Sequence, residues 1–164
     1  MKIEELIADK KKLDEAYSFY IKKKILKKSD SNLSKAHLYK SDSNMEFVDF
    51  LLKNDKFPDW CIVGLYYSVY HASLALLSHK GYSSKDHNAT LCFLIKNFSE
   101  FSKEDIELID DLQIKRDEIE FYSGLKEERR KASYSTSLLF DKASINNFRK
   151  SSIQLINKIK AIIA

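Results

Sequence analysis

The chain has 164 residues but only three glycines and one proline. Average usage would give a chain of this length about 11 glycines and about 8 prolines. Sandwiches and barrels need frequent turns, and dinucleotide-binding α/β folds need glycine-rich loops, so this composition argues against both classes. With 28 Lys and Arg against 24 Asp and Glu, the net charge of +4 permits a polyanionic partner without requiring one.

The hydrophobic share of 44% is large enough for a folded core, and the length suits one domain over residues 1–164. The two cysteines, Cys61 and Cys92, lie far apart and outside any CxxC motif. We therefore expect buried thiols in a reducing compartment and a cytoplasmic protein. The first twelve residues include acids and lack an apolar signal-peptide core, which agrees with that location.

Apolar residues at steps of three and four predict one amphipathic helix over residues 2–27. Lysines, including those at 10–12 and 22–24, fill the opposite face. The ordinary interpretation of such a face is a solvated surface. The alternative is a basic strip that binds RNA or an acidic partner.

The tetrapeptide Ser-Asp-Ser-Asn occurs twice, at residues 29–32 and 41–44. These residue types favour caps and turns because their side chains hydrogen-bond to nearby backbone. The second copy either starts a helix, with Ser43 and Glu46 forming a capping box, or lies in the exposed middle of a helix over about 32–53.

Fourteen of the 18 residues from Trp60 to Leu77 are apolar, which predicts a helix over residues 59–80. A helix that is apolar on nearly every side is surrounded by other helices, so we place this one at the centre of a bundle and not across a membrane. Pro58 suits its first turn, Gly81 suits a left-handed C-cap, and Gly64 suits close packing against a neighbouring helix.

Three further helices are predicted, at residues 85–98, 103 to about 122, and 141–163. Ser102 is a good N-cap for the second of these helices, and Gly124 is expected to end or bend it. The fold class is therefore all-α, an up-and-down bundle of five to six helices. Residues 125–140 show the least regular pattern.

Arg116 is the most informative single residue. Ile109 and Leu112 precede it by seven and four positions, and Ile119 follows it by three, so Arg116 lies on or beside the apolar face of its helix. An unpaired buried guanidinium is costly. Arg116 therefore needs either a carboxylate on another helix or a functional role.

The sequence contains no phosphate-binding glycine loop, no HExxH, no GxSxG and no zinc-type cysteine pair, so we expect neither a metal nor a cofactor. His87, beside a predicted helix start, is a candidate for the border of a cleft. Basic residues flank the Arg116 helix and are candidate contacts to nucleic acid or nucleotide, although such runs are more often solvated: Lys115, Lys126, Arg129 and Arg130.

The central helix reads GLYYSVYHASLALLSHKGY, and SSKDHNATLCFLIKNF, DDLQIKRDEIEFY and KASYSTSLLFDKASINNFRKSSIQLINKIKAII follow it in order. This series resembles the HEPN family of small helical prokaryotic proteins. The family pattern has a YYxxYHAxxALL helix, a KxH segment, a later helix with an Arg-x4–6-His motif, and a final helix with an apolar end. The resemblance covers about residues 57–164, and residues 1–53 match in pattern only.

The resemblance implies a helical homodimer whose arginines and histidines line one shared cleft and cut RNA without metal. The ribose 2′-hydroxyl would be the attacking group. An arginine fork can stabilise the transferring phosphate, and a histidine can move a proton near neutral pH. Arg116 matches the motif arginine, and Asp117 matches the polar residue that often follows it.

The motif histidine is missing, because positions 121–123 read Phe-Tyr-Ser. Tyr122 is the nearest polar residue, and its ordinary pKa of about 10 makes it a poor base. On an undistorted helix Tyr122 lies about 120° around from Arg116. The two side chains can reach one cleft only if the helix bends or ends nearby, at Gly124.

Three functions remain open from these features. The first is a HEPN-like homodimer that binds RNA or nucleotide with weak or no nuclease activity, alongside a nucleotidyltransferase-like protein as in toxin–antitoxin pairs. The second is a metal-independent endoribonuclease that uses Arg116, Asp117 and Tyr122, helped by His87. The third is a structural or adaptor bundle in which Arg116 only forms a salt bridge.

Overall fold

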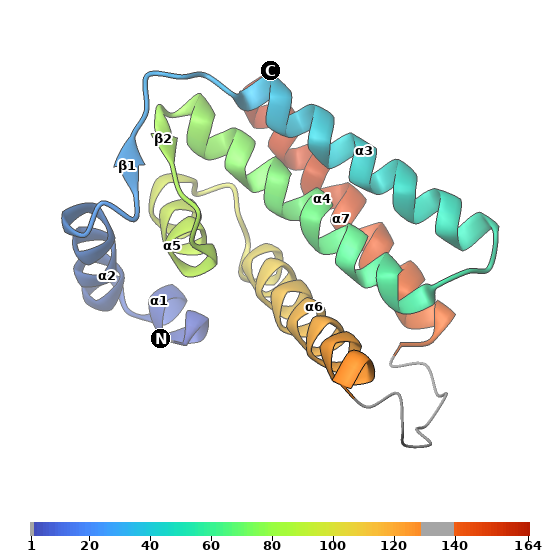
Figure 1. Cartoon of the computed structure of the whole chain (residues 1–164). Helices are drawn as coiled ribbons and strands as arrows, with labels where there is room; N and C mark the ends of the chain where they lie inside the picture. The colour runs from blue at the N-terminus through green and yellow to red at the C-terminus, as the bar shows by residue number, and fades with distance from the viewer. Residues whose placement is uncertain (1, 129–139) are drawn as a thin grey trace.

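Helices dominate the computed structural model, which describes residues 2–128 and 140–164 (Figure 1). Within these ranges there are seven helices and a two-stranded sheet in which β1 and β2 are antiparallel. The elements are α1 (Ile3–Ala8), α2 (Lys10–Lys22), β1 (Lys27–Lys28), α3 (Ser34–Lys53), α4 (Pro58–His79), β2 (Tyr82–Ser83), α5 (His87–Asn97), α6 (Lys103–Glu128) and α7 (Lys142–Ile163). The predicted all-α class is confirmed.

The long helix α4 occupies the centre of the molecule, as its apolar sequence predicts. It packs against α3, α6 and α7, while α1, α2 and α5 contact one another beside its C-terminal end (Figure 1). By length and composition α4 is the one described helix that could cross a membrane, but 78% of its most apolar window is buried inside the protein. Such burial is typical of a core helix.

Helices α3 and α4 lie unusually close together at Gly64. A Cβ atom at this position would lie 2.6 Å from Val48 Cγ2 and 3.3 Å from Phe47 Cδ1. Farther along, Ser68 Oγ donates a hydrogen bond to the Ser41 carbonyl at 2.8 Å. The predicted role of Gly64 in close helix packing is confirmed.

The second Ser-Asp-Ser-Asn copy lies inside α3, so the alternative in which it starts a helix is wrong. Helix α3 begins at Ser34, after the first copy. Ser41 is buried against α4, whereas Asp42 is exposed. Pro58 opens α4, and Gly81 follows its end with a φ of 75°, as predicted.

The prediction of one helix over residues 2–27 is wrong, which is why seven helices are described and not five to six. Asp9 adopts an extended conformation and caps α2, since its carboxylate accepts hydrogen bonds from the backbone N–H groups of Lys11 and Lys12. Helix α2 then ends at Lys22, and the chain turns through Lys24, with a φ of 56°, into β1.

Gly124 does not end its helix, because α6 continues past it to Glu128. A single glycine inside a helix costs only about 1 kcal/mol relative to alanine, which the surrounding helical residues can offset. The expected helix end at about 122 is therefore wrong, and no break in the helix lies next to Arg116.

Both cysteines are free thiols in the core, as predicted. Burial raises the pKa of Cys92 to about 11 and also raises the pKa of Cys61. Because the thiolate is the reactive form, these cysteines behave as apolar core residues.

Candidate functional site

The side chain of Arg116 extends from α6 onto two tyrosines of α4. Its Cζ lies 4.6 Å from the ring centroid of Tyr66 and 5.7 Å from that of Tyr67. Nη1 donates a hydrogen bond to the Tyr67 hydroxyl at 3.2 Å. Only 18% of the Arg116 side chain is exposed. Cation–π contact and the tyrosine hydroxyl therefore hold the guanidinium against α4.

An acidic side chain from the same helix covers the outer edge of this guanidinium. Arg116 Nη2 donates to Asp117 Oδ1 at 2.6 Å, and Gln113 Nε2 donates to Asp117 Oδ2 at 2.8 Å. Burial works to lower the pKa of Arg116, but hydrogen bonds to Asp117 and Tyr67 outweigh it and raise that pKa above its ordinary value. Arg116 is thus a fixed positive charge.

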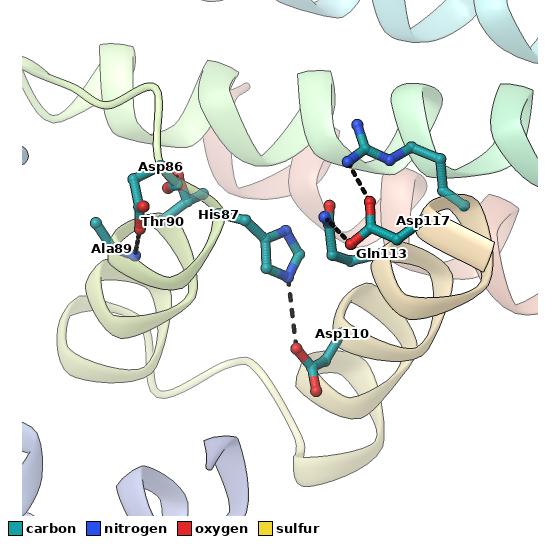
Figure 2. A network of polar contacts seen from close by, with 8 residues as sticks. Asp86, His87, Ala89, Thr90, Asp110, Gln113 and Asp117 are labelled. Carbon is teal, nitrogen blue, oxygen red and sulfur yellow. Dashed lines mark hydrogen bonds and ion pairs between the residues drawn. The ribbon is translucent and has the colours of Figure 1, made fainter. Parts of the chain in front are cut away.

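His87 also lies close to Tyr66. Its ring centroid is 6.0 Å from that of Tyr66 and 6.1 Å from that of Tyr70, and its Nε2 is 3.5 Å from Asp110 Oδ1 (Figure 2). Burial, with a smaller contribution from the positive charge of Arg116, lowers the pKa of His87 to about 4. His87 is therefore neutral at pH 7.

Local capping fixes His87 in this place. Asp86 is the N-cap of α5, and its carboxylate accepts a hydrogen bond from the backbone N–H of Ala89 at 2.7 Å. Thr90 Oγ1 also donates to the Asp86 carbonyl at 2.8 Å. These bonds set the first turn of α5, of which His87 is the first residue (Figure 2).

Three tyrosines of α4 connect Arg116 with His87; the Tyr66 and Tyr70 rings are stacked, and the Tyr66 and Tyr67 rings meet edge to face. The Tyr66 ring centroid is 5.1 Å from that of Tyr67 and 5.4 Å from that of Tyr70, and we call these residues the tyrosine cluster. Burial raises the pKa of Tyr66 and of Tyr70, so both phenols stay protonated. The cluster is a rigid aromatic support with Arg116 and His87 packed on it.

Several buried polar atoms in this region have no hydrogen-bond partner among the described residues. They are His87 Nδ1, His87 Nε2, Gln113 Oε1 and Arg116 Nε. The contact of His87 with Asp110 is at ion-pair distance and is not a hydrogen bond. Unsatisfied polar atoms are costly, so this region retains hydrogen-bonding capacity that a polar ligand can use.

Lys115 is not part of the candidate site formed by Arg116, His87 and the tyrosine cluster. Its Nζ lies 5.4 Å from the ring centroid of Phe148 and 6.0 Å from that of Phe140. Lys115 therefore packs toward α7, while the neighbouring Arg116 packs toward α4.

The remaining predicted residues lie at or beyond the end of the described region. Tyr122 belongs to α6, which continues past Gly124, so the helix end that could have brought Tyr122 toward Arg116 is not there. The side chains of Tyr122 and Lys126, and all of Arg129 and Arg130, lie outside the described residues.

Sequence reasoning found Arg116, Asp117 and His87 but missed Gln113 and the tyrosine cluster as parts of one site. Gln113 precedes Asp117 by four residues, a spacing that puts both on one helix face and could have revealed their contact. The contact of Arg116 with Tyr67 joins residues 49 positions apart, and no local pattern reveals it.

No protein-family model matches this chain, and no curated protein shows significant similarity to it. The resemblance to HEPN proteins remains a prediction that rests on the four sequence segments. Among residues 2–128 and 140–164, no group of three or more His, Cys, Asp or Glu side chains is arranged to hold a metal ion.

Proposed function

We propose that this protein is a cytoplasmic, HEPN-like homodimer that binds RNA or a nucleotide through the phosphate, with Arg116 as the central contact. The observation that supports this most is the unequal burial of the charges. The Arg116 side chain is 18% exposed, whereas that of its acidic partner Asp117 is 54% exposed. A phosphate arriving from solvent can therefore take the place of Asp117 on a guanidinium that stays fixed.

The chemistry of the guanidinium fits this ligand. Arginine presents its N–H donors as a planar fork that matches two phosphate oxygens. The tyrosine cluster holds the fork from one side, so little conformational freedom is lost when a ligand binds. Arg116 Nε makes no hydrogen bond, but it lies 4.0 Å from Glu120 Oε2, so a second carboxylate of α6 also faces the guanidinium.

We propose weak or no nuclease activity, because a good general base is missing. The motif histidine is absent, and Tyr122 follows Arg116 on an unbroken helix. His87 is neutral, but a pKa of about 4 makes it a weak proton acceptor. The resemblance further supports a role beside a separate nucleotidyltransferase-like partner.

The proposal is tested by equilibrium binding of the purified protein to a fluorescent single-stranded RNA and to AMP, together with its mass at tens of micromolar. We expect a dimer that binds at least one of the two ligands. A monomer that binds neither would contradict the proposal.

The position of His87 supports one second candidate, a metal-independent endoribonuclease. His87 and Arg116 pack on the same ring of Tyr66, so a neutral imidazole and a fixed positive charge lie in one place. Structured RNA incubated with the protein in EDTA distinguishes the two functions. Cleavage by the wild type that is lost in Arg116→Ala would favour the nuclease; equal cleavage by both, or none by either, would exclude it.

A further inference from the structure

A dense group of lysines lies at the junction of α2 and β1, away from Arg116. We call it the lysine platform, and its members are Lys22, Lys23, Lys24, Lys27 and Lys28. All five are exposed. Their combined charge exceeds the +4 of the whole chain, so the rest of the molecule is close to neutral. The positive charge of this protein is therefore concentrated at one end.

The lysines of the platform have no acidic partners. None of the five makes an ion pair or a side-chain hydrogen bond in the described structure. Several basic residues elsewhere lie within ion-pair distance of a carboxylate on another residue: Lys11, Lys12, Lys96, Lys103, Lys142, Arg149, Lys158 and Lys160. Other described lysines, such as Lys35 and Lys56, also lack such a partner, but they are not clustered as the platform lysines are. The platform thus keeps its charge available for an external anion.

The platform is also held in a fixed conformation. Leu26 is fully buried, and its N–H donates to the Tyr20 carbonyl at 3.1 Å. Lys27 and Lys28 belong to β1, which pairs with β2, and Ser29 N–H donates to the Gly81 carbonyl at 2.9 Å. A rigid array of charges loses less conformational entropy on binding than a disordered basic tail.

An exposed aromatic ring lies beside these charges. Phe19 is 52% exposed and precedes Lys22 and Lys23 by three and four residues, which puts it on their side of α2. Lysines that follow a phosphate backbone, with an aromatic ring on which a base can stack, are typical of surfaces that bind single-stranded nucleic acid. A membrane surface fits less well, because Leu26 faces the core and only Phe19 and Ile21 are exposed large apolar side chains beside the platform, too few for the broad apolar face that binds lipid.

The distance between the platform and Arg116 limits the kind of ligand that can touch both. Gly81 contacts the platform segment, and Tyr67 contacts Arg116. The 1.5 Å rise per helical residue places these positions roughly 20 Å apart along α4. A mononucleotide cannot span that distance, whereas an RNA strand can, with on the order of six phosphates at 3.4 Å per nucleotide.

We propose that the lysine platform is a second contact for the RNA backbone and selects an RNA strand over a mononucleotide. This inference rests on the proposed function, since it assumes that Arg116 binds one phosphate of the same strand. The platform supplies sequence-independent affinity through release of counterions, and Arg116 fixes one phosphate in place.

The test compares two triple variants with the same loss of charge. In the platform variant Lys23, Lys27 and Lys28 are changed to Gln, and in the control Lys11, Lys103 and Lys142 are changed to Gln. A labelled single-stranded RNA of about 12 nucleotides, long enough for the span estimated above, is titrated at several salt concentrations. AMP is titrated in parallel.

We expect the platform variant to bind RNA on the order of tenfold more weakly than the wild type. The slope of log affinity against log salt concentration should become less steep by about 2. AMP binding should stay unchanged, and the control should bind RNA almost as the wild type does. Equal losses in both variants, or no loss in the platform variant, would overturn the inference. So would platform-dependent binding to phosphatidylserine vesicles without platform-dependent binding to RNA.

The failure of the inference is separable from that of the proposed function. Suppose that Arg116→Ala no longer binds RNA or AMP, while the platform variant binds RNA as the wild type does. The proposed function then stands, and the platform is excluded as an RNA contact. If Arg116→Ala keeps both ligands, the proposed function fails, and the inference fails with it.

Discussion

At the scale of single residues, Arg116 and Asp117 form an ion pair whose members affect a phosphate ligand in opposite ways: Arg116 attracts it, and Asp117 repels it. Arg116 is fixed on the tyrosine cluster, and Asp117 lies where a phosphate would bind. Gln113 holds Asp117 in that place. Asp117 is therefore expected to compete with the ligand, although the sequence analysis grouped it with the catalytic candidates.

Asp117→Asn should tighten the binding of RNA and AMP. The amide keeps the shape of the side chain but removes the competing negative charge. Because the Asp117 end of the pair is exposed, we expect a contribution on the scale of surface ion pairs, about 0.2–1 kcal/mol, or up to about fivefold in affinity. Fluorescence anisotropy measures the change. Asp111→Asn, an exposed change of the same charge on the same helix, is the control, and an equal effect of both variants would count against the competition.

The buried histidines make stability depend on pH. The pKa of His87 and that of His71 are each about 4 in the folded protein, mainly because of burial, and about 6.5 in an unfolded chain. Between these values the unfolded state binds more protons, so stability rises with pH and falls upon acidification. The contribution of these two histidines to the free energy of unfolding is fully present above about pH 6.5 and is lost progressively as the pH falls toward 4.

Urea unfolding at pH 7 and at pH 5 tests this dependence. The His87 contribution amounts to a loss of about 2 kcal/mol at pH 5. His87→Gln should therefore lose less stability than the wild type on going from pH 7 to pH 5. His79→Gln, a change at an exposed histidine, should behave as the wild type does. Parallel behaviour of wild type and His87→Gln would show that His87 does not titrate as described.

At the scale of secondary-structure elements, hydrophobic pattern predicted the helices whose limits are set locally. Helices α4, α5 and α7 lie within two residues of their predicted limits. Pro58 and Gly81 marked the ends of α4 in the sequence, and the structure shows that Asp86 and Asp141 cap α5 and α7. The pattern failed over residues 2–27, since the apolar stripe continues across the Asp9 break and the pairing of β1 with β2 joins distant residues.

The close approach of α3 to α4 gives a prediction for Gly64. Gly64→Ala gains about 1 kcal/mol of helix propensity but places Cβ 2.6 Å from Val48 Cγ2, and overpacking of this kind costs about 1–3 kcal/mol. We expect a net loss of stability in urea unfolding. Adding Val48→Ala should relieve the clash, so the double variant should be more stable than the sum of the single effects. Strict additivity would exclude the clash.

At the scale of the whole molecule, the candidate site joins α4, α5 and α6. The sequence alone singled out one polar residue on each of two elements, because Arg116 interrupts an apolar face and His87 lies beside a predicted helix start. It did not show that both meet on Tyr66, since that contact depends on how three helices pack. The sequence alone also does not indicate that Asp117 competes with a ligand for Arg116, because this inference depends on the exposure of each side chain in the folded protein.

The proposed homodimer should use the side of α4 that lies next to Arg116 of α6. Trp60 is 43% exposed and precedes Tyr67 by seven residues, so both lie on one side of the helix. Light scattering should give twice the mass of one chain for the wild type and a lower mass for Trp60→Lys. Tyr39→Lys, an exposed aromatic change on α3, is the control. A dimer that withstands Trp60→Lys would place the interface elsewhere.

The central claim is that Arg116 binds a phosphate of RNA or nucleotide and does not merely stabilise the bundle. The most direct measurement is the affinity of Arg116→Lys and Arg116→Ala for single-stranded RNA at one salt concentration, with thermal unfolding of each variant. Lysine keeps the charge but lacks the planar fork. We predict that both folded variants lose RNA affinity by on the order of tenfold or more, as expected when a charge-assisted hydrogen bond is removed. Variants that are less stable yet bind RNA as the wild type does would contradict the claim.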